Sequence, residues 1–418
     1  MKTMRYRFFI LTVWSLLLLS CPGINNSPNV IIKELIDGLQ GRSKRENQWG
    51  SLAANIPNNI GNTFTGDQKT TRTITWQSTI DSGEVIIGNN RYPAVSVMVD
   101  DYYFHRVDIS GLESGKTYWF IAGALDWYSP KYSFTTESPS FPDGFSILHI
   151  TDPQIGTSDK NLTDAEVWKQ VIETAVKQCP GAAFVVNTGD VVNNTREARI
   201  PFYFDYAQEI LAKYAFVYSL GNNDSLDWYD SYFYITDNRN DDYSGVLYSF
   251  DYGNTHFVSI NVDFLGTDDD DDVNFDLSAG QLEWLENDLK NSSGKWKVAM
   301  THKPDYGRNS RTNANTEVTK LFDKYSVDLV LAGHYHFYMR SNPIDTAGDD
   351  KENGTVWSIP NVAGTKFNGE SGRSYLAVDE QPELPMFSEL NFTATNIYLN
   401  AYTVDSDGNA VLFDTYTF

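Results

Sequence analysis

The feature that most constrains this chain is a short run, Val327 to Ala332, that is apolar except for one aspartate and stops at Gly333. Such a run predicts a buried strand. His334 and His336 follow at once. On a loop that leaves a strand, this spacing lets two imidazoles approach the same small volume, and neutral imidazole is the commonest protein ligand for transition metals. The stretch therefore predicts a metal site at the end of a strand.

Four earlier strand-like runs also end in residues that suit a metal. Ser146 to Ile150 precedes Asp152 and Gln154, Ala182 to Asn187 precedes Gly189 and Asp190, Phe216 to Leu220 precedes Gly221, Asn222, Asn223 and Asp224, and Lys297 to Thr301 precedes His302. Helical patterns separate the runs, which predicts an α/β domain, and ligands of open α/β folds lie beyond the carboxyl ends of strands. These side chains are therefore expected to converge.

The residue types suit two divalent metals. Carboxylate, amide oxygen and imidazole together favour Mn, Fe or Zn. Asp190 follows a glycine that lets the backbone approach closely, so this carboxylate is placed to bridge the two ions. Two metals about 3.5–4 Å apart can clamp a phosphoryl group. Near His302, Lys303 is either a phosphate-binding cation or an ordinary surface lysine.

Capping signals predict two helices in this region. Thr163 with Glu166 and Ser278 with Gln281 each match a capping box ahead of an apolar face. A further strand is expected over His256 to Val262. From about Tyr375 the pattern returns to β, and Ser406-Asp407-Gly408 predicts a turn between two strands that end at Phe418.

Residues 59–137 have a different texture, with short alternating runs separated by Gly and Asp. This alternation predicts a small antiparallel sandwich. Two prolines in residues 137–142 mark the connection to the α/β region, and His105 is expected to be structural. The expected strands are Thr71 to Gln77, Val95 to Val99, Phe104 to Ile109, Thr117 to Ala122 and Lys131 to Thr135.

Residues 1–21 resemble a bacterial lipoprotein leader. Lys2, Arg5 and Arg7 precede an apolar segment, Phe8 to Leu19, that is too short to span a bilayer comfortably. Cys21 would then be lipidated and become the mature N-terminus, anchored to the bacterial envelope. An ordinary signal peptide on a secreted protein and an uncleaved anchor remain the alternatives. Residues 22–58 are predicted to be a linker.

Charge and cysteine content exclude several classes. The formal net charge of −23 argues against nucleic-acid binding and against a docking surface for anionic lipid, so the only expected membrane contact is the anchor. With 2 Cys, one of them in the leader, the chain has no disulfide framework, and Cys179 is expected in the core. Asp268 to Asp272 is either a calcium-binding loop or a solvated acidic loop.

The ordered set of strand-end residues resembles the calcineurin-like metallophosphoesterases. The preceding sandwich resembles the fibronectin type III-like module of the purple acid phosphatase branch, with Ile74-Thr75-Trp76 and Tyr132-Ser133-Phe134-Thr135-Thr136 as the matching segments. The resemblance implies a β-sandwich domain over residues 59–137. It further implies an α/β metallophosphoesterase domain over residues 143–418, built as a two-sheet βαβ sandwich flanked by helices.

The resemblance also implies two ligand sets. One metal would take Asp152, Asp190 and His336, and the other Asp190, Asn222, His302 and His334. Hydrolysis in the family proceeds by in-line attack of a metal-bound hydroxide, with two divalent ions such as Mn, Fe or Zn as cofactors and a small phosphorylated molecule as substrate. Asp190 and Asn223 would take part in catalysis, and Asn223 and Lys303 would bind the phosphate.

Three positions depart from the family pattern. Gln154 stands where many members have a histidine, and is expected to be an oxygen ligand. Asn193 stands where the purple enzymes have a tyrosinate ligand, so no charge-transfer colour is expected. Asn223 stands where a histidine usually helps to protonate the leaving group, and losing a general acid could cost about 10²–10⁴ in rate.

These observations predict an acid phosphatase-like phosphoesterase outside the cytoplasm, acting on phosphoesters and chiefly on monoesters. The alternative is a degenerate member, weakly active or non-catalytic, that binds metal and a ligand at the cell surface. Asn223 and Gln154 motivate this alternative.

Overall fold

The computed structural model describes residues 54–418, except for 65, 142–143, 159–160, 226–228, 230, 235–246, 261–276 and 307–315. Residues 55–418 form one compact unit. The leader with Cys21, most of the predicted linker and the acidic run Asp268 to Asp272 lie outside the described residues. Within the described ranges, no helix is both long enough and apolar enough to cross a membrane.

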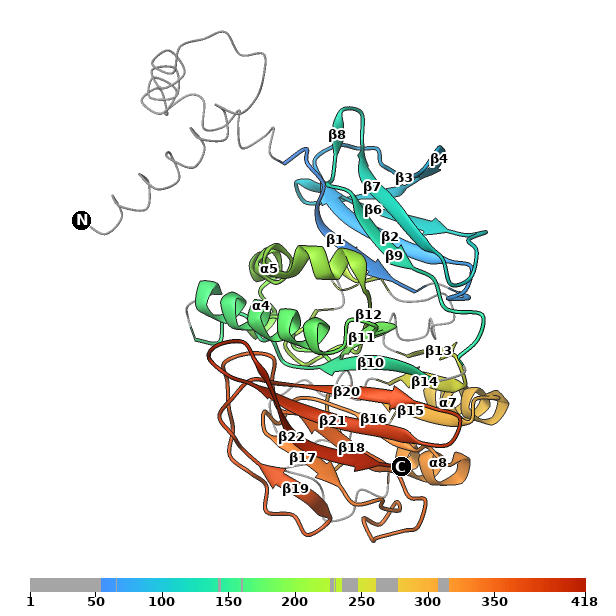
Figure 1. Ribbon diagram of the computed structural model, residues 1–418, viewed down its shortest axis with the longest axis vertical. Helices are drawn as coiled ribbons and strands as arrows, with labels where there is room; N and C mark the ends of the chain where they lie inside the picture. The colour runs from blue at the N-terminus through green and yellow to red at the C-terminus, as the bar shows by residue number, and fades with distance from the viewer. Residues whose placement is uncertain are drawn as a thin grey trace, which may run out of the picture. The chain divides into compact units, whose positions relative to one another are not determined.

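The N-terminal part is a sandwich of two sheets around a shared apolar core (Figure 1). One sheet has the order β1-β2-β6-β5, and the other has the order β4-β3-β7-β8 with β9 on β7. Trp76 and Val107 reach the core from the first sheet, and Val85 and Phe120 from the second. The strands are β1 (Asn58–Thr63), β2 (Arg72–Ser78), β3 (Glu84–Ile87), β4 (Asn90–Pro93), β5 (Val95–Val99), β6 (Tyr102–Ile109), β7 (Thr117–Ala124), β8 (Trp127–Tyr128) and β9 (Tyr132–Thr135).

All five predicted strands are present here, but β1, β3, β4 and β8 were not predicted. The sequence of β1 is Asn-Asn-Ile-Gly-Asn-Thr, which is polar and has the composition of a linker. Its polar groups are bound across the fold: the Ile60 N–H donates to Gln208 Oε1 at 2.9 Å, and Asn62 Nδ2 donates to the Ala212 carbonyl at 3.1 Å. Helix α5 (Ile200–Lys213) supplies both partners, so the sandwich is joined directly to the α/β part. The fibronectin type III-like assignment and the domain limits stay predictions.

His105 lies in the sandwich core, as expected for a structural residue. Its ring stacks on Trp76 with centroids 4.9 Å apart. Its two nitrogens contact Ser78 Oγ at 2.9 Å and Ser96 Oγ at 2.8 Å.

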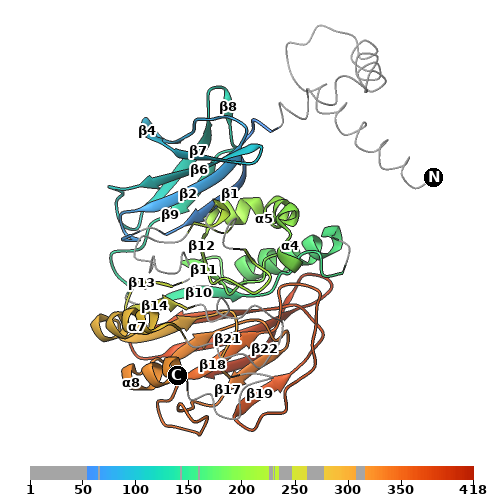
Figure 2. The same cartoon turned by 180° about the vertical axis from the view of Figure 1, so that it is seen from behind.

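The α/β part contains two further sheets that pack face to face (Figure 2). The first has the order β12-β11-β10-β20-β21-β22, with β10, β11 and β12 parallel. The second has the order β13-β14-β15-β16-β18-β17-β19, with β14, β15, β16 and β18 parallel. The strands are β10 (Phe145–Ile150), β11 (Phe184–Asn187), β12 (Ala215–Tyr218), β13 (Tyr248–Tyr252), β14 (Thr255–Ser259), β15 (Trp296–Met300), β16 (Leu329–Leu331), β17 (Tyr338–Ser341), β18 (Val356–Pro360), β19 (Leu376–Glu380), β20 (Met386–Phe392), β21 (Ile397–Val404) and β22 (Ala410–Thr417).

Both faces of the second sheet are covered, which explains its continuous apolar strands. In β16, Leu329 and Leu331 face the core shared with the first sheet, while Val330 faces a second core under the helices α7 (Ala279–Asn291) and α8 (Glu317–Tyr325). This alternation is the two-residue period of a strand. Helices α4 (Asn161–Gln178) and α5 lie on the outer side of the first sheet (Figure 1). The predicted βαβ sandwich flanked by helices is therefore confirmed.

One of the two predicted helix starts is correct. Ser278 caps α7, its Oγ accepting from the Gln281 N–H while Gln281 Oε1 accepts from the Ser278 N–H. The start at Thr163 is wrong, because α4 already begins at Asn161 and Thr163 lies within its first turn. A Thr-x-x-Glu pattern also occurs inside helices, so the pattern alone does not fix the first residue. Cys179 is buried in the core, and the Gly408 turn joins β21 to β22 as predicted.

His256 links the β13–β14 hairpin to α7. We expect its contacts to make the free energy of unfolding depend on pH. Its Nδ1 lies 2.7 Å from Asp251 Oδ1 and its Nε2 2.8 Å from Asp288 Oδ2. Burial disfavours the charged ring, but the two carboxylates outweigh it and raise the pKa of His256 to about 9. Because the charged ring is favoured in the folded protein, these contacts add up to about 3 kcal/mol to the free energy of unfolding. This stabilisation is complete below pH 6.5 and is lost as the pH rises through about 9.

Urea titrations of the wild type and of His256→Gln at several pH values test this expectation. The free energy of unfolding should fall between pH 6.5 and 9 in the wild type and change less in the variant. Equal slopes in the two proteins would contradict the assignment.

Candidate metal centre

The predicted site residues lie on loops that leave the carboxyl ends of parallel strands in both sheets. Asp152 follows β10, Asp190 follows β11 and Asn222 follows β12, all from the first sheet, while His302 follows β15 and His334 follows β16, both from the second. The carboxyl ends of parallel strands meet at one edge, so each sheet delivers its side chains to the same place.

Five of the residues predicted to bind metal have left-handed backbone conformations. Their φ angles are positive in Asp152 (51°), Gln154 (40°), Asp190 (54°), His334 (76°) and His336 (56°). Each such residue costs on the order of 1–3 kcal/mol, and such strain gathers at functional sites where the surrounding structure enforces it.

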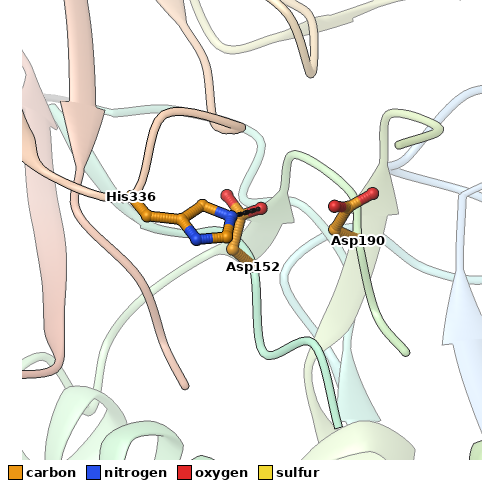
Figure 3. A group of neighbouring side chains, drawn as sticks. All are labelled: Asp152, Asp190 and His336. Carbon is orange, nitrogen blue, oxygen red and sulfur yellow. Dashed lines mark hydrogen bonds and ion pairs between the residues drawn. The ribbon is translucent and has the colours of Figure 1, made fainter. Parts of the chain in front are cut away.

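Asp152, Asp190 and His336 form the first cluster of possible ligands (Figure 3). All three are buried, and one donor atom from each lies within 4.8 Å of the others. His336 Nε2 is 3.1 Å from Asp152 Oδ1. The other carboxylate oxygen of Asp152 accepts from Thr151 Oγ1 at 2.7 Å and from the His334 N–H at 2.9 Å, so the Asp152 side chain is oriented before any ion binds.

Asn222, His302 and His334 form a second cluster beside Asp190. Asn222 Oδ1 is 2.9 Å from His334 Nδ1 and 3.2 Å from His302 Nε2. His302 Nε2 is in turn 3.3 Å from Asp190 Oδ1. Two ligand atoms that each lie about 2.1 Å from one ion are separated by about 3–4 Å, so these spacings suit a shared metal.

The hydrogen bond on the far side of His302 favours a cation at this cluster. His302 Nδ1 is 2.7 Å from the Thr188 carbonyl oxygen, which can only accept, so Nδ1 carries the proton. When the ring is neutral, its Nε2 lone pair points toward the oxygens of Asn222 and Asp190. A lone pair among acceptor oxygens is repulsive unless a cation lies between them. The residues present therefore fit a metal, and the Thr188 carbonyl is the outer partner that a ligating histidine needs.

The charges in the site suit the same conclusion. Burial disfavours the ionised form of Asp190, but in the absence of a metal the charge of protonated His302 and the backbone N–H of Asn223 hold the pKa of this carboxyl below its ordinary value. Burial, His302 and Lys303 lower the pKa of His334 well below its ordinary value. The carboxylate and the neutral imidazole are the forms that bind metals.

Comparison with known proteins identifies the domain that carries these clusters. Residues 145–338 match the calcineurin-like phosphoesterase family. The chain contains a calcineurin-like metallophosphoesterase domain. Purple acid phosphatase 15 of Arabidopsis thaliana is 28% identical over 169 residues, 37% of this chain and 30% of the relative. Acid phosphatase type 7 of Mus musculus is 25% identical over 271 residues, 58% of each chain. This chain thus spans only part of both relatives.

The fold has a solved counterpart. The structure of the purple acid phosphatase PPD1 from yellow lupin (Lupinus luteus) seeds superposes with a TM-score of 0.70, at 17% identity, over 87% of this chain and 74% of that chain. At this identity the likeness speaks for the shared architecture of the metallophosphoesterase fold.

Two carboxamides of the metallophosphoesterase domain are bound to Asp190. Asn223 donates twice, from its backbone N–H to Asp190 Oδ1 at 2.8 Å and from Nδ2 to Oδ2 at 2.7 Å. Gln154 Nε2 donates to the same Oδ2 at 3.0 Å. The amide nitrogen of Gln154 thus faces the carboxylate, and the predicted role of Gln154 as an oxygen ligand stays a prediction. So do the other ligand assignments and the substrate-binding roles of Asn223 and Lys303.

Asp224 is the buried residue beside the site whose contacts the strand-end pattern did not reveal. It is buried, and its Oδ2 accepts from the backbone N–H groups of Asp190 and Gly221, both at 2.8 Å. Its Oδ1 accepts from the Val191 N–H at 3.0 Å. One carboxylate thereby ties the Asp190 loop to the Asn222 loop. Its position at the end of Gly221-Asn222-Asn223-Asp224 placed it near the predicted site, but it did not indicate which backbone N–H groups the carboxylate accepts from.

Replacing Asp224 with Asn is expected to weaken metal binding by about 10–100-fold, the usual cost of disturbing an outer partner of the ligands. The amide oxygen can replace one carboxylate oxygen, but the amide NH₂ then meets a backbone N–H donor. Competition with a chelator measures the metal affinity. Asp407→Asn, at an exposed turn, is the control. Unchanged affinity in the Asp224 variant would show that the loops hold their places without it.

Proposed function

We propose that this protein hydrolyses phosphoesters, chiefly phosphomonoesters, at a site that holds two divalent metal ions. The observation that carries the proposal is the convergence of Asp152, Asp190 and His336 with Asn222, His302 and His334 at one edge of the two sheets. Asp190 belongs to both clusters and is the residue placed to serve both ions. The acid phosphatase relatives support the reaction class.

The ions, Mn, Fe or Zn by the chemistry of the donor set, would polarise the phosphoryl group and lower the pKa of water. The chain's own residues hold the geometry. Asp152 and His336 are fixed by their mutual contact, and His302 is held by the Thr188 carbonyl. Lys303 adds a positive charge near His334, which suits an anionic substrate.

The test is reconstitution of the full chain with Mn, Fe or Zn, followed by assays on aryl phosphates. Turnover should require metal and should vanish in His302→Ala. His256→Gln removes an imidazole outside the site and should retain activity at pH 6, with melting temperatures recorded for both variants. A protein that binds none of these metals, or that hydrolyses phosphates equally well without them, would refute the proposal.

A second candidate is a protein that binds metal and a phosphorylated ligand with little or no turnover. The observation that favours it is Asn223, whose side-chain amide donates to Asp190 and cannot release a proton near neutral pH. Metal binding without hydrolysis of any phosphoester would support this candidate over the first.

We also propose that the protein acts outside the cytoplasm and is held at the bacterial envelope by a lipid on Cys21. The basic and apolar leader supports this placement. Cells fed radiolabelled palmitate should label the wild type and leave Cys21→Ser unlabelled. Label in both proteins, or in neither, would contradict the anchor.

A further inference from the structure

His336 and His302 are held in place by different means. The ring of His302 is fixed from behind, because its Nδ1 contacts the Thr188 carbonyl oxygen. The ring of His336 contacts Asp152 through Nε2 (Figure 3), and the residues that the structure describes offer no hydrogen-bond partner to its buried Nδ1. A ligating histidine usually has an outer partner that sets the direction of its ring. For His336, the structure shows such contacts on the backbone.

The carbonyl oxygen of His336 accepts two hydrogen bonds from residues that follow β18. The Asn368 N–H donates to it at 3.0 Å, and Gln381 Nε2 donates to it at 2.5 Å. Asn368 Nδ2 also donates to the preceding carbonyl, that of Tyr335, at 3.1 Å. His336 has a positive φ of 56°, a conformation that persists only where the surrounding structure enforces it. These three bonds supply that constraint.

The carboxamide of Gln381 is bound on both sides. Its Nε2 donates to the carbonyl oxygens of His336 and of Asn368, the latter at 2.7 Å. Its Oε1 accepts from Asn361 Nδ2 at 2.9 Å and from the Glu383 N–H at 3.0 Å. Both donors and both acceptor positions of the amide are therefore used, and the amide has a single orientation.

The residues that contact Gln381 also reach the loop of Asp152. Asn361 is buried and directly follows β18, and two residues later the Ala363 N–H donates to the Thr151 carbonyl at 2.7 Å. A Cβ atom on Gly364 would lie 2.8 Å from the Asp152 carbonyl oxygen, so the two backbones pass in close contact. The segment 361–368 thus touches both loops that carry the first cluster of possible ligands.

We propose that Gln381 is a positioning residue for His336, and that it sets the affinity of the first metal site through the His336 carbonyl. This inference rests on the proposed metal-dependent function. The Gln381 amide bonds to backbone groups and to Asn361, so it acts through His336 and not on the substrate. In Gln381→Glu, a carboxylate oxygen would face the carbonyl oxygens of His336 and Asn368. These oxygens repel one another, so His336 should move away from Asp152.

Calorimetric titration of Zn²⁺ into the metal-free full chain tests this role without requiring turnover. We expect two binding steps in the wild type. In Gln381→Glu, one step should weaken by about 10–100-fold, the usual cost of disturbing an outer partner of a ligand. The other step should change far less, because His302 and Asn222 are held by other contacts. Gln381→Met removes the donors without adding a charge and should weaken the same step, so it decides the question if the glutamate variant does not fold.

Gln208→Glu is the matched control. Its carboxamide also bridges backbone groups, with Nε2 donating to the Ile60 carbonyl at 2.8 Å and Oε1 accepting from the Ile60 N–H at 2.9 Å, but it lies where α5 meets the sandwich. Melting temperatures should fall in both variants, whereas metal affinity should fall only in Gln381→Glu. Equal metal affinity in the two variants, or equal weakening of both steps in Gln381→Glu, would overturn the positioning role.

The outcomes separate this inference from the proposed function. Unaltered metal affinity in Gln381→Glu, with an active wild type, overturns the positioning role and leaves phosphoester hydrolysis standing. Selective loss of one ion in Gln381→Glu, with a wild type that hydrolyses no phosphoester, refutes the proposed function and leaves the positioning role standing. A wild type that binds no metal refutes both.

Discussion

Replacing Asp190 with Asn is expected to lower kcat/KM for an activated phosphate substrate by about 10³-fold, the loss typical of removing one charge-stabilising group from an active site. Asp190 is buried, and it is the one carboxylate that lies in both ligand clusters. The substitution keeps the size of the side chain but removes its negative charge. It should therefore weaken both metal sites together.

The hydrogen bonds of Asp190 sharpen this expectation. Both of its oxygens accept N–H donors: Oδ1 from the Asn223 backbone, and Oδ2 from Asn223 Nδ2 and Gln154 Nε2. In the asparagine variant, one oxygen becomes an NH₂ group that must face one of these donors. An unsatisfied buried donor costs about 1–3 kcal/mol, so the loop should also be displaced.

Steady-state kinetics and elemental analysis of bound metal measure the two effects. Asp407→Asn, an exposed change at the β21–β22 turn, should retain both activity and metal. An Asp190→Asn protein that keeps its full metal content and activity would show that Asp190 does not serve the metal site.

Replacing Gly333 with Ala is expected to displace the ligand loop that follows β16 in the second sheet. A Cβ atom at this position would lie 2.1 Å from Thr151 Oγ1 and 2.7 Å from Asp152 Oδ2, far inside contact distance. The side chains of Thr151 and Asp152 are buried and hydrogen-bonded to each other, so neither can move away from the added methyl group without breaking that bond. We expect a loss of about 1–3 kcal/mol in stability from overpacking. We also expect weaker metal binding, because the His334 N–H that contacts Asp152 follows directly.

Thermal melts and metal titrations test this prediction. Gly181→Ala is the matched control: a Cβ there has no heavy atom within 4 Å, and the reduced freedom of the unfolded chain should make the change neutral or slightly stabilising. If Gly333→Ala melts and binds metal like Gly181→Ala, the close approach at Gly333 does not shape the site.

The convergence of the site was predictable because it depends on local signals. Each ligand candidate directly follows an apolar run, and the carboxyl ends of parallel strands must share an edge. Strand β16 shows that such signals predict a buried strand but not its exact ends. Its apolar character marked it as buried, but the structure confines it to Leu329–Leu331, because strand limits depend on which neighbours the backbone pairs with.

The polar strand β1 was beyond such reasoning. Its residues carry no apolar period, and they become a strand because Gln208 and the end of α5, some 150 positions later in the chain, accept and donate its hydrogen bonds. The same limit applies to Asp224, whose three backbone partners lie on two loops.

The α/β sandwich, the edge at which the site forms and the residue types that could bind metal follow from the amino-acid order, because apolar period and strand-end chemistry are properties of short segments. The contacts among these residues arise only when the chain is folded. Folding turns the Asn223 and Gln154 carboxamides onto Asp190, fixes the His302 ring against the Thr188 carbonyl and joins two loops through Asp224. Each of these contacts joins residues more than 30 positions apart, and only the folded chain sets their distance.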